Sequence, residues 1–146
     1  MLLAAQFICT FCAALFAGAA LYINVAEHPA RMGLETGVAA KQWASSYKRA
    51  TWLQVPLVLL GFAAGVIAWF LGASIVWLVA ALLIGAVVPF TFIAVMRTNN
   101  KLLALGRDLA SAETRALLET WGKLHAVRTG LSLLATVLCI WLLVRV

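Results

Sequence analysis

Charged residues are scarce in this chain. Of its 146 residues, 11 are Lys or Arg and 5 are Asp or Glu, so 11% carry a charge, whereas 65% are hydrophobic. An average soluble domain has roughly 25% charged and about 45–50% apolar residues, and a domain of this length could not bury so much apolar surface. The composition therefore excludes a soluble globular fold, a disordered chain and a nucleic-acid-binding module, despite the formal net charge of +6.

The few charges are clustered, and residues 1–26 and 50–96 contain none. A helix needs about 20 apolar residues to cross the hydrocarbon core of a bilayer, and the backbone groups of a segment in lipid must be hydrogen-bonded within the protein. We therefore predict an all-α fold, a four-helix transmembrane bundle that forms a single domain over residues 1–146, with spans at about 2–26, 51–71, 74–96 and 126–144.

The positive charges predict how this bundle is oriented. Four spans put both termini on the same side of the membrane, and the charged segments 27–50 and 97–128, which hold ten of the eleven Lys and Arg residues, on the other side. Because Lys and Arg favour the cytoplasmic side, we place the long loops inside and both termini outside, in a bacterial inner membrane. Glycine and alanine are frequent in the spans, which permits close helix packing and also a homodimer.

Prolines and glycines mark the expected interruptions. Pro29 and Gly33 are expected to break the chain just after the first span. A short helix from about Val38 to Tyr47 should run into the second span. Pro89 is expected to kink the third span and to free a backbone carbonyl.

The last helix is predicted to be too long for the bilayer. Asp108 or Ser111 can cap a helix that runs without proline over residues 112–144. At 1.5 Å per residue it would measure about 50 Å, so we expect it to extend into the cytoplasm. Its polar part contains the i,i+4 pairs Arg115–Glu119 and Glu119–Lys123.

Cysteine and histidine are also rare. Cys9 and Cys12 form a Cys-x-x-Cys string, which can be redox-active, and Cys139 is expected at a similar depth in the last span. A quinone-linked thiol oxidase would need a second cysteine pair, so we interpret all three as small buried apolar residues. With two histidines the chain cannot offer three imidazole ligands to a metal, and it has no phosphate-binding or nucleophile-elbow motif.

Polar and aromatic residues gather at the predicted cytoplasmic ends of the helices, where they could line one pocket. They are Glu27, His28, Arg31, Trp43, Tyr47, Arg49, Arg97, Asn99, Asn100, Trp121, His125 and Arg128. The alternative interpretation is that the Trp, Tyr, Arg and Lys residues are interfacial anchors. For the two histidines we favour function, because histidine is a poor anchor and changes its protonation near neutral pH. Deeper in the spans, Gln54 and Thr91 are candidates for the same pocket, although Gln54 could instead make an interhelical hydrogen bond.

Four motifs occur in order along nearly the whole chain. They are Glu27-His28-Pro29-Ala30-Arg31-Met32, then Trp43-x3-Tyr47-x-Arg49-x4-Gln54, then Pro89-x-Thr91 followed by Thr98-Asn99, and finally Trp121-x2-Leu124-His125-x2-Arg128. This combination resembles the anthrone oxygenase-like family of small integral membrane proteins, much of which is catalogued only as a domain of unknown function. Its characterised members oxidise an anthrone to an anthraquinone with molecular oxygen.

The resemblance implies a monooxygenase that acts on an apolar, aromatic small molecule and on molecular oxygen within the lipid bilayer. His28 or His125 would be the general base, while Arg31, Asn99 and Arg128 would stabilise the oxyanion. The aromatic side chains would stack on a flat substrate. We expect no cofactor. The substrate-binding candidates are Arg31, Trp43, Tyr47, Arg49, Gln54, Thr91, Asn99, Trp121 and Arg128.

Two other functions stay open from the sequence. The protein could be a non-enzymatic membrane ligand-binding or assembly protein. It could also be a metal- or haem-binding redox protein that uses His28 and His125, with Glu27 as the third metal ligand.

Overall fold

The computed structural model describes residues 1–145; residue 146, the last of the predicted single domain, lies outside the described residues. In chain order the elements are α1 (Leu2–Tyr22), the π-helical turn η1 (Ile23–Glu27), α2 (His28–Met32), α3 (Thr36–Phe70), α4 (Ile75–Gly85), α5 (Val87–Phe90), the π-helical turn η2 (Thr91–Val95), α6 (Met96–Leu102) and α7 (Ala112–Val144). Together they form helices long and apolar enough to cross a membrane, namely Leu2–Met32, Thr36–Phe70, Ile75–Leu102 and Ala112–Val144.

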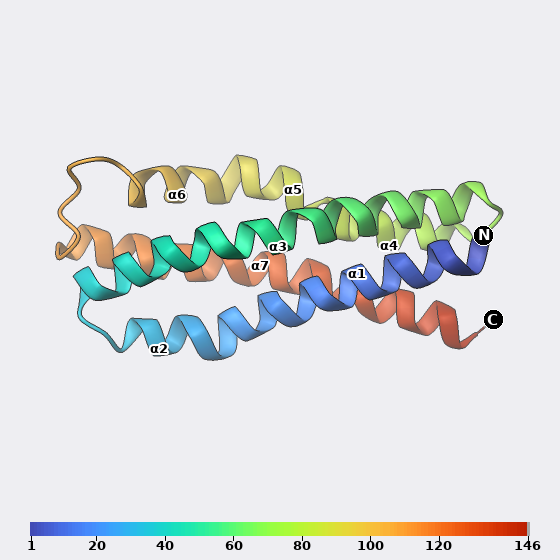
Figure 1. The fold of residues 1–146 in the computed structure, drawn as a ribbon, viewed down its shortest axis with the longest axis horizontal. Coiled ribbons are helices and arrows are strands. Elements are labelled where there is room, and N and C mark those ends of the chain that lie inside the picture. The colour runs from blue at the N-terminus through green and yellow to red at the C-terminus, as the bar shows by residue number, and fades with distance from the viewer. Residues whose placement is uncertain (146) are drawn as a thin grey trace.

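These four long helices form an elongated bundle (Figure 1). α1 packs against α3 and α7, and α4 packs against the same two helices from the other side. Both termini lie at one end of the bundle (Figure 1). The all-α prediction is confirmed, and each predicted span corresponds to the apolar part of one long helix.

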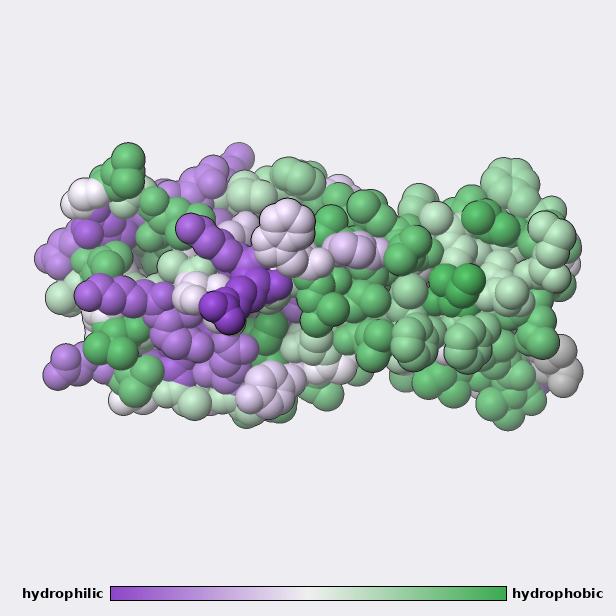
Figure 2. All heavy atoms as spheres, viewed as in Figure 1, coloured by the Kyte–Doolittle hydropathy of each residue, from purple (hydrophilic) through white to green (hydrophobic). Residues whose placement is uncertain are grey.

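The two ends of the bundle differ in polarity. Hydrophilic side chains gather at the end that contains α2 and the loop between α6 and α7, whereas the end with both termini is almost uniformly hydrophobic on the face shown (Figure 2). We call the end that holds residues 27–50 and 97–125 the polar end, and the end with the termini the apolar end. The charge clusters of the sequence thus meet in space.

The prediction that Pro29 breaks the first helix is wrong. Helical structure continues through Pro29 to Met32, and the chain turns only at Gly33. Proline lacks the N–H that an α-helix would need for its bond to the residue four positions earlier. Here Pro29 is the second residue of α2, which directly follows η1, and the backbone N–H of His28 bonds to the carbonyl of Ile23, five residues back. The wider turn and the early position of Pro29 in α2 let the helix proceed.

The third helix is interrupted near Pro89, as predicted. α4 ends at Gly85, a turn at Ala86 leads into α5, and the π-helical turn η2 follows. The hydroxyl of Thr91 donates to the carbonyl of Val87 at 2.7 Å. Because Pro89 cannot donate an N–H to the preceding turn, α6 does not continue along α4, and Figure 1 shows the two segments offset from each other.

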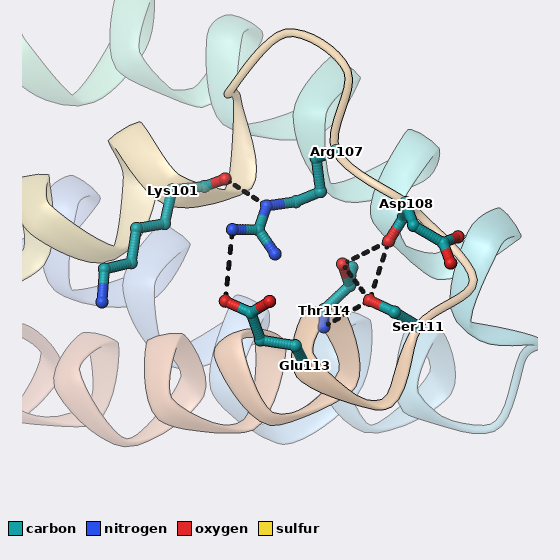
Figure 3. Close-up of polar contacts among 6 residues, drawn as sticks. All are labelled: Lys101, Arg107, Asp108, Ser111, Glu113 and Thr114. Carbon is teal, nitrogen blue, oxygen red and sulfur yellow. Dashed lines mark hydrogen bonds and ion pairs between the residues drawn. The ribbon is translucent and has the colours of Figure 1, made fainter.

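The start of α7 is fixed by side-chain capping (Figure 3). The Ser111 hydroxyl accepts the backbone N–H of Thr114 at 3.2 Å, and the Thr114 hydroxyl donates to the carbonyl of Asp108 at 2.8 Å. Arg107 donates to the carbonyl of Lys101 at 2.5 Å, which holds the loop against α6. Ser111 is therefore the N-cap, and the predicted helix over 112–144 is confirmed.

The two predicted i,i+4 pairs of α7 do not form among the described residues. Arg115 instead donates to the backbone carbonyls of Leu34 and Met32, with the Leu34 bond at 3.0 Å. These carbonyls lie at the end of the first long helix, where they lack helical partners. Arg115 thus ties the turn between α2 and α3 to the start of α7.

The apolar end is closely packed around small residues. A Cβ atom added to Gly65 of α3 would lie 2.7 Å from Cβ of Ala81 in α4 and 3.0 Å from Sγ of Cys9 in α1. The Sγ atoms of Cys9 and Cys139 lie 3.8 Å apart. All three cysteines are free and buried, as the sequence predicts for small apolar residues.

Candidate functional site

A cavity of about 350 Å³ lies between the polar end and the middle of the bundle. This volume is in the range of small-molecule sites. All four long helices contribute, and the π-helical turns supply Ile23 from η1 and Thr91 and Phe92 from η2. Most of the wall is apolar. The polar lining residues are Arg31, Ser46, Tyr47, Thr51, Gln54, Thr91, His125 and Arg128.

Most of the candidate residues from the sequence meet in this cavity. Those that line it are Arg31, Trp43, Tyr47, Gln54, Thr91, Trp121, His125 and Arg128. The others lie elsewhere. Arg49 is exposed and lines a separate shallow groove with Gln42 and Ser45. Asn99 is buried in α6, with an exposed fraction of 1%, but does not line the cavity.

His28 and Glu27 also lie outside the cavity lining. Nε2 of His28 occupies the space beside Gly122, where an added Cβ would lie 2.4 Å from it. The His28 ring is 5.4 Å from the ring of Trp121, measured between centroids. Glu27 accepts hydrogen bonds from Arg31 and from Ser46. Within residues 1–145, no three His, Cys, Asp or Glu side chains are grouped closely enough to hold a metal ion.

Two stacked pairs form an aromatic wall of the cavity. Trp43 and Tyr47 of α3 lie 5.2 Å apart with an interplanar angle of 6°, and Trp121 and His125 of α7 lie 4.8 Å apart at 29°. Both pairs have i,i+4 spacing, which places them on one face of each helix. The Trp43 and Trp121 rings meet edge to face at 5.9 Å and 81°. The equivalent spacing in α3 and α7 thus gives two aromatic surfaces that meet nearly at a right angle.

Arg128 brings a positive charge to the cavity without a carboxylate partner among the described residues. Its Nη2 donates to Oε1 of Gln54 at 3.0 Å, and its guanidinium lies 5.7 Å from the ring centroid of Phe16. A charge in apolar surroundings is costly unless it is paired. A ligand that carries negative charge would provide that pairing.

Arg31 differs from Arg128 because its charge is already balanced. It forms a salt bridge with Glu27 and donates to the side-chain oxygen of Gln42. Only 2% of Arg31 is exposed, so this pairing holds the residue in place between α2 and α3. Arg31 therefore shapes the polar wall of the cavity, while Arg128 supplies the uncompensated charge.

Several buried N–H groups of the lining residues have no hydrogen-bond partner within the described part of the chain. They are Nε1 of Trp43, Nε2 of Gln54, Nε1 of Trp121 and Nε of Arg128. Buried donors are normally paired, and leaving one unpaired costs about 1–3 kcal/mol. All four atoms belong to residues that line the cavity.

Asn24 of η1 was not among the residues selected from the sequence. Its Oδ1 lies 2.8 Å from Nδ1 of His125 and 2.5 Å from the hydroxyl of Thr129. The available signal was an amide in an otherwise apolar span, because polar residues in transmembrane segments tend to face the bundle interior. Its partner, 101 residues away in sequence, could not be identified from spacing.

Comparisons with known proteins agree with the resemblance drawn from the motifs. The model of the anthrone oxygenase family matches residues 43–138, more than half of the chain and all of the α7 part of the cavity. Anthrone oxygenase tpcL of Aspergillus fumigatus is 37% identical over 70 residues, which cover 46% of this chain and 44% of that protein, less than half of its length. No solved structure matches the chain. The chain belongs to the anthrone oxygenase family.

Proposed function

We propose that the protein oxidises a reduced polycyclic phenol of the anthrone type with molecular oxygen. Family membership suggests an oxygenase for an aromatic substrate. The observation that carries the proposal is the combination, in one cavity, of the His125 imidazole, the Arg128 guanidinium without a carboxylate partner among the described residues, and the Trp43 and Trp121 rings, which meet edge to face. These groups can accept a proton, hold an anion and bind a flat ring.

In the proposed reaction, His125 removes a proton from the acidic methylene carbon of the substrate. The electrons of that C–H bond form an anion that is delocalised onto the carbonyl oxygen of the substrate. The Arg128 guanidinium stabilises this oxyanion. The carbanion carbon then bonds to O₂, and the resulting peroxide takes back the proton from His125 to give a hydroperoxide. This hydroperoxide loses water to form the quinone carbonyl. One O₂ is consumed for each quinone and each water formed. No cofactor is invoked, because the substrate anion supplies the electrons.

We further propose that the substrate reaches the cavity from the lipid. Three lining residues are also exposed on the outside of the bundle, with exposed fractions of 49% for Val55, 54% for Leu59 and 65% for Phe92. They come from α3 and η2, so the cavity opens sideways between these elements. Apolar aromatic compounds partition into a bilayer, and a sideways opening lets them bind without crossing water.

The test uses the purified full chain in lipid nanodiscs with anthrone as substrate. Oxygen uptake and quinone absorbance are followed together against a protein-free control, since anthrone also oxidises slowly by itself. We expect one oxygen per quinone. His125→Gln should lower kcat by about 10²-fold or more, because a positioned base contributes that much. Arg128→Gln should lower kcat/KM by about 10²-fold.

Arg49→Gln is the matched control for Arg128→Gln, because Arg49 is an exposed arginine outside the cavity; its kcat/KM should equal that of the wild type. Quenching of tryptophan fluorescence by anthrone with no oxygen uptake above the control would identify the protein as a ligand-binding protein and refute the oxygenase proposal.

The polar end is proposed to face the cytoplasm, with both termini outside. This rests on the segments 27–50 and 97–128, which hold ten of the eleven Lys and Arg residues. In a chain without its native cysteines, Lys48→Cys and Lys123→Cys should react with a membrane-impermeant maleimide only after the cells are opened. Ser74→Cys, at the apolar end, should react in intact cells. The reverse pattern would invert the orientation.

A further inference from the structure

The imidazole of His125 is held by its Nδ1 atom. The residue is 1% exposed, and its ring stacks on Trp121 with 4.8 Å between centroids. Nδ1 lies 2.8 Å from Oδ1 of Asn24, which comes from the first long helix. One nitrogen of the ring is thus engaged with η1, and Nε2 remains for chemistry in the cavity that His125 lines.

The orientation of the Asn24 amide follows from its other partners. Nδ2 of Asn24 lies 3.3 Å from the backbone carbonyl oxygen of Gly122. A carbonyl oxygen can only accept a hydrogen bond, so the NH₂ group must face Gly122. The amide oxygen then faces His125, and it also accepts the hydroxyl of Thr129 at 2.5 Å. Both contacts of the amide agree on one orientation.

This orientation determines which ring nitrogen carries the proton. An amide oxygen has no hydrogen to donate, so Nδ1 of His125 must be the donor in the bond to Asn24. In a neutral imidazole the proton on Nδ1 leaves the lone pair on Nε2. We infer that Asn24 is a positioning residue that fixes His125 as a base at Nε2, and this inference rests on the proposed function.

The arrangement also suits the protonated state of the base. When Nε2 takes the substrate proton, Nδ1 keeps its own proton and its bond to Asn24, so the ring does not need to turn during the reaction. The neutral amide orients the ring without adding a negative charge beside the anion-binding Arg128. Asn24 lies in η1, and π-helical turns are frequent at functional sites.

The first experiment measures the tautomer directly and needs no substrate. Protein labelled with ¹⁵N-histidine in nanodiscs gives separate NMR signals for the two imidazoles, which a His28→Gln variant assigns. We expect His125 to carry its proton on Nδ1. A wild-type protein with the proton on Nε2 would overturn the inference, whether or not anthrone is a substrate, so this result is independent of the proposed function.

The second experiment replaces the amide. Asn24→Leu should populate the Nε2-protonated tautomer of His125 and lower kcat about 10²-fold with little change in KM, because the base is lost while the binding walls remain. Asn24→Asp keeps an acceptor oxygen and should restore the Nδ1-protonated signal. Gln6→Leu removes the other amide of the first long helix, which does not line the cavity; it is the matched control and should change neither.

Unchanged tautomer and kcat in Asn24→Leu would show that the amide is merely structural and would overturn the inference. If the tautomer shifts as expected while neither wild type nor variant oxidises anthrone, the role of Asn24 in orienting His125 stands and the proposed function fails.

Discussion

The same four helices pack in two different ways along the bundle. At the apolar end, α3 approaches α4 so closely that a Cβ on Gly65 would lie 2.7 Å from that of Ala81. Toward the polar end, the same helix α3 carries Trp43 and Tyr47 and borders a cavity of about 350 Å³. Small residues close one half, and large aromatic residues hold the other half open.

The interruption in the third helix explains the difference. α4 packs along α3 until Gly85, and the turn at Ala86 and the π-helical turn η2 then redirect the chain. Val87, Val88, Thr91 and Phe92, which follow the end of α4, line the cavity. The cavity therefore lies beside backbone interruptions, whereas at the apolar end small residues let the helices pack closely.

The largest expected effect comes from adding a large side chain at the closely packed apolar end. Gly65→Leu must push α3 away from Ala81 and from Cys9, because both would lie within 3.0 Å of the new Cβ. Overpacking of this kind should lower the free energy of unfolding by about 3 kcal/mol, measured by denaturant titration in detergent micelles. Gly18→Leu is the control, because a Cβ there meets nothing within 4 Å. Equal stability of the two variants would contradict close packing at the apolar end.

The same side chain added on the same helix at the cavity should have the opposite outcome. Ala50 lines the cavity, so Ala50→Leu fills open space and should leave the free energy of unfolding unchanged or raise it by up to about 1 kcal/mol. It should weaken the binding of anthraquinone, followed by tryptophan fluorescence, about tenfold, which is 1.4 kcal/mol. A loss of stability like that of Gly65→Leu would mean that both halves are equally tight.

The sequence predicted the framework of the bundle well. Charge-free stretches are a strong signal for helices in lipid. The sequence offered Asp108 or Ser111 as the cap of the last helix, and the structure has Ser111 in that place. The i,i+4 spacing of Trp121 and His125 also carried over, since helical spacing fixes which side chains share a face.

Contacts between distant helices could not be predicted in this way. Pro29 looked like a breaker because sequence patterns assume α-helical geometry, and the π-helical turn before it was invisible. Arg115 has the backbone carbonyls of Met32, at the end of α2, and of Leu34, in the turn that follows, as partners instead of Glu119. Likewise His28, whose Nδ1 lies 3.3 Å from Nη1 of Arg31, lies outside the cavity that Arg31 lines, because its ring packs beside Gly122 of α7.

The smallest expected effect concerns the opening between α3 and η2. Phe92 lines the cavity and is 65% exposed, so it stands between the lipid and the site. Phe92→Ala should raise the association rate of anthraquinone about threefold with little change in kcat, measured by stopped-flow quenching of tryptophan fluorescence in nanodiscs. Phe70→Ala, which removes a 75% exposed phenylalanine at the apolar end, should leave the rate unchanged. If both variants or neither altered the rate, access would not pass between α3 and η2, and the two halves of the bundle would not differ in how they admit a ligand.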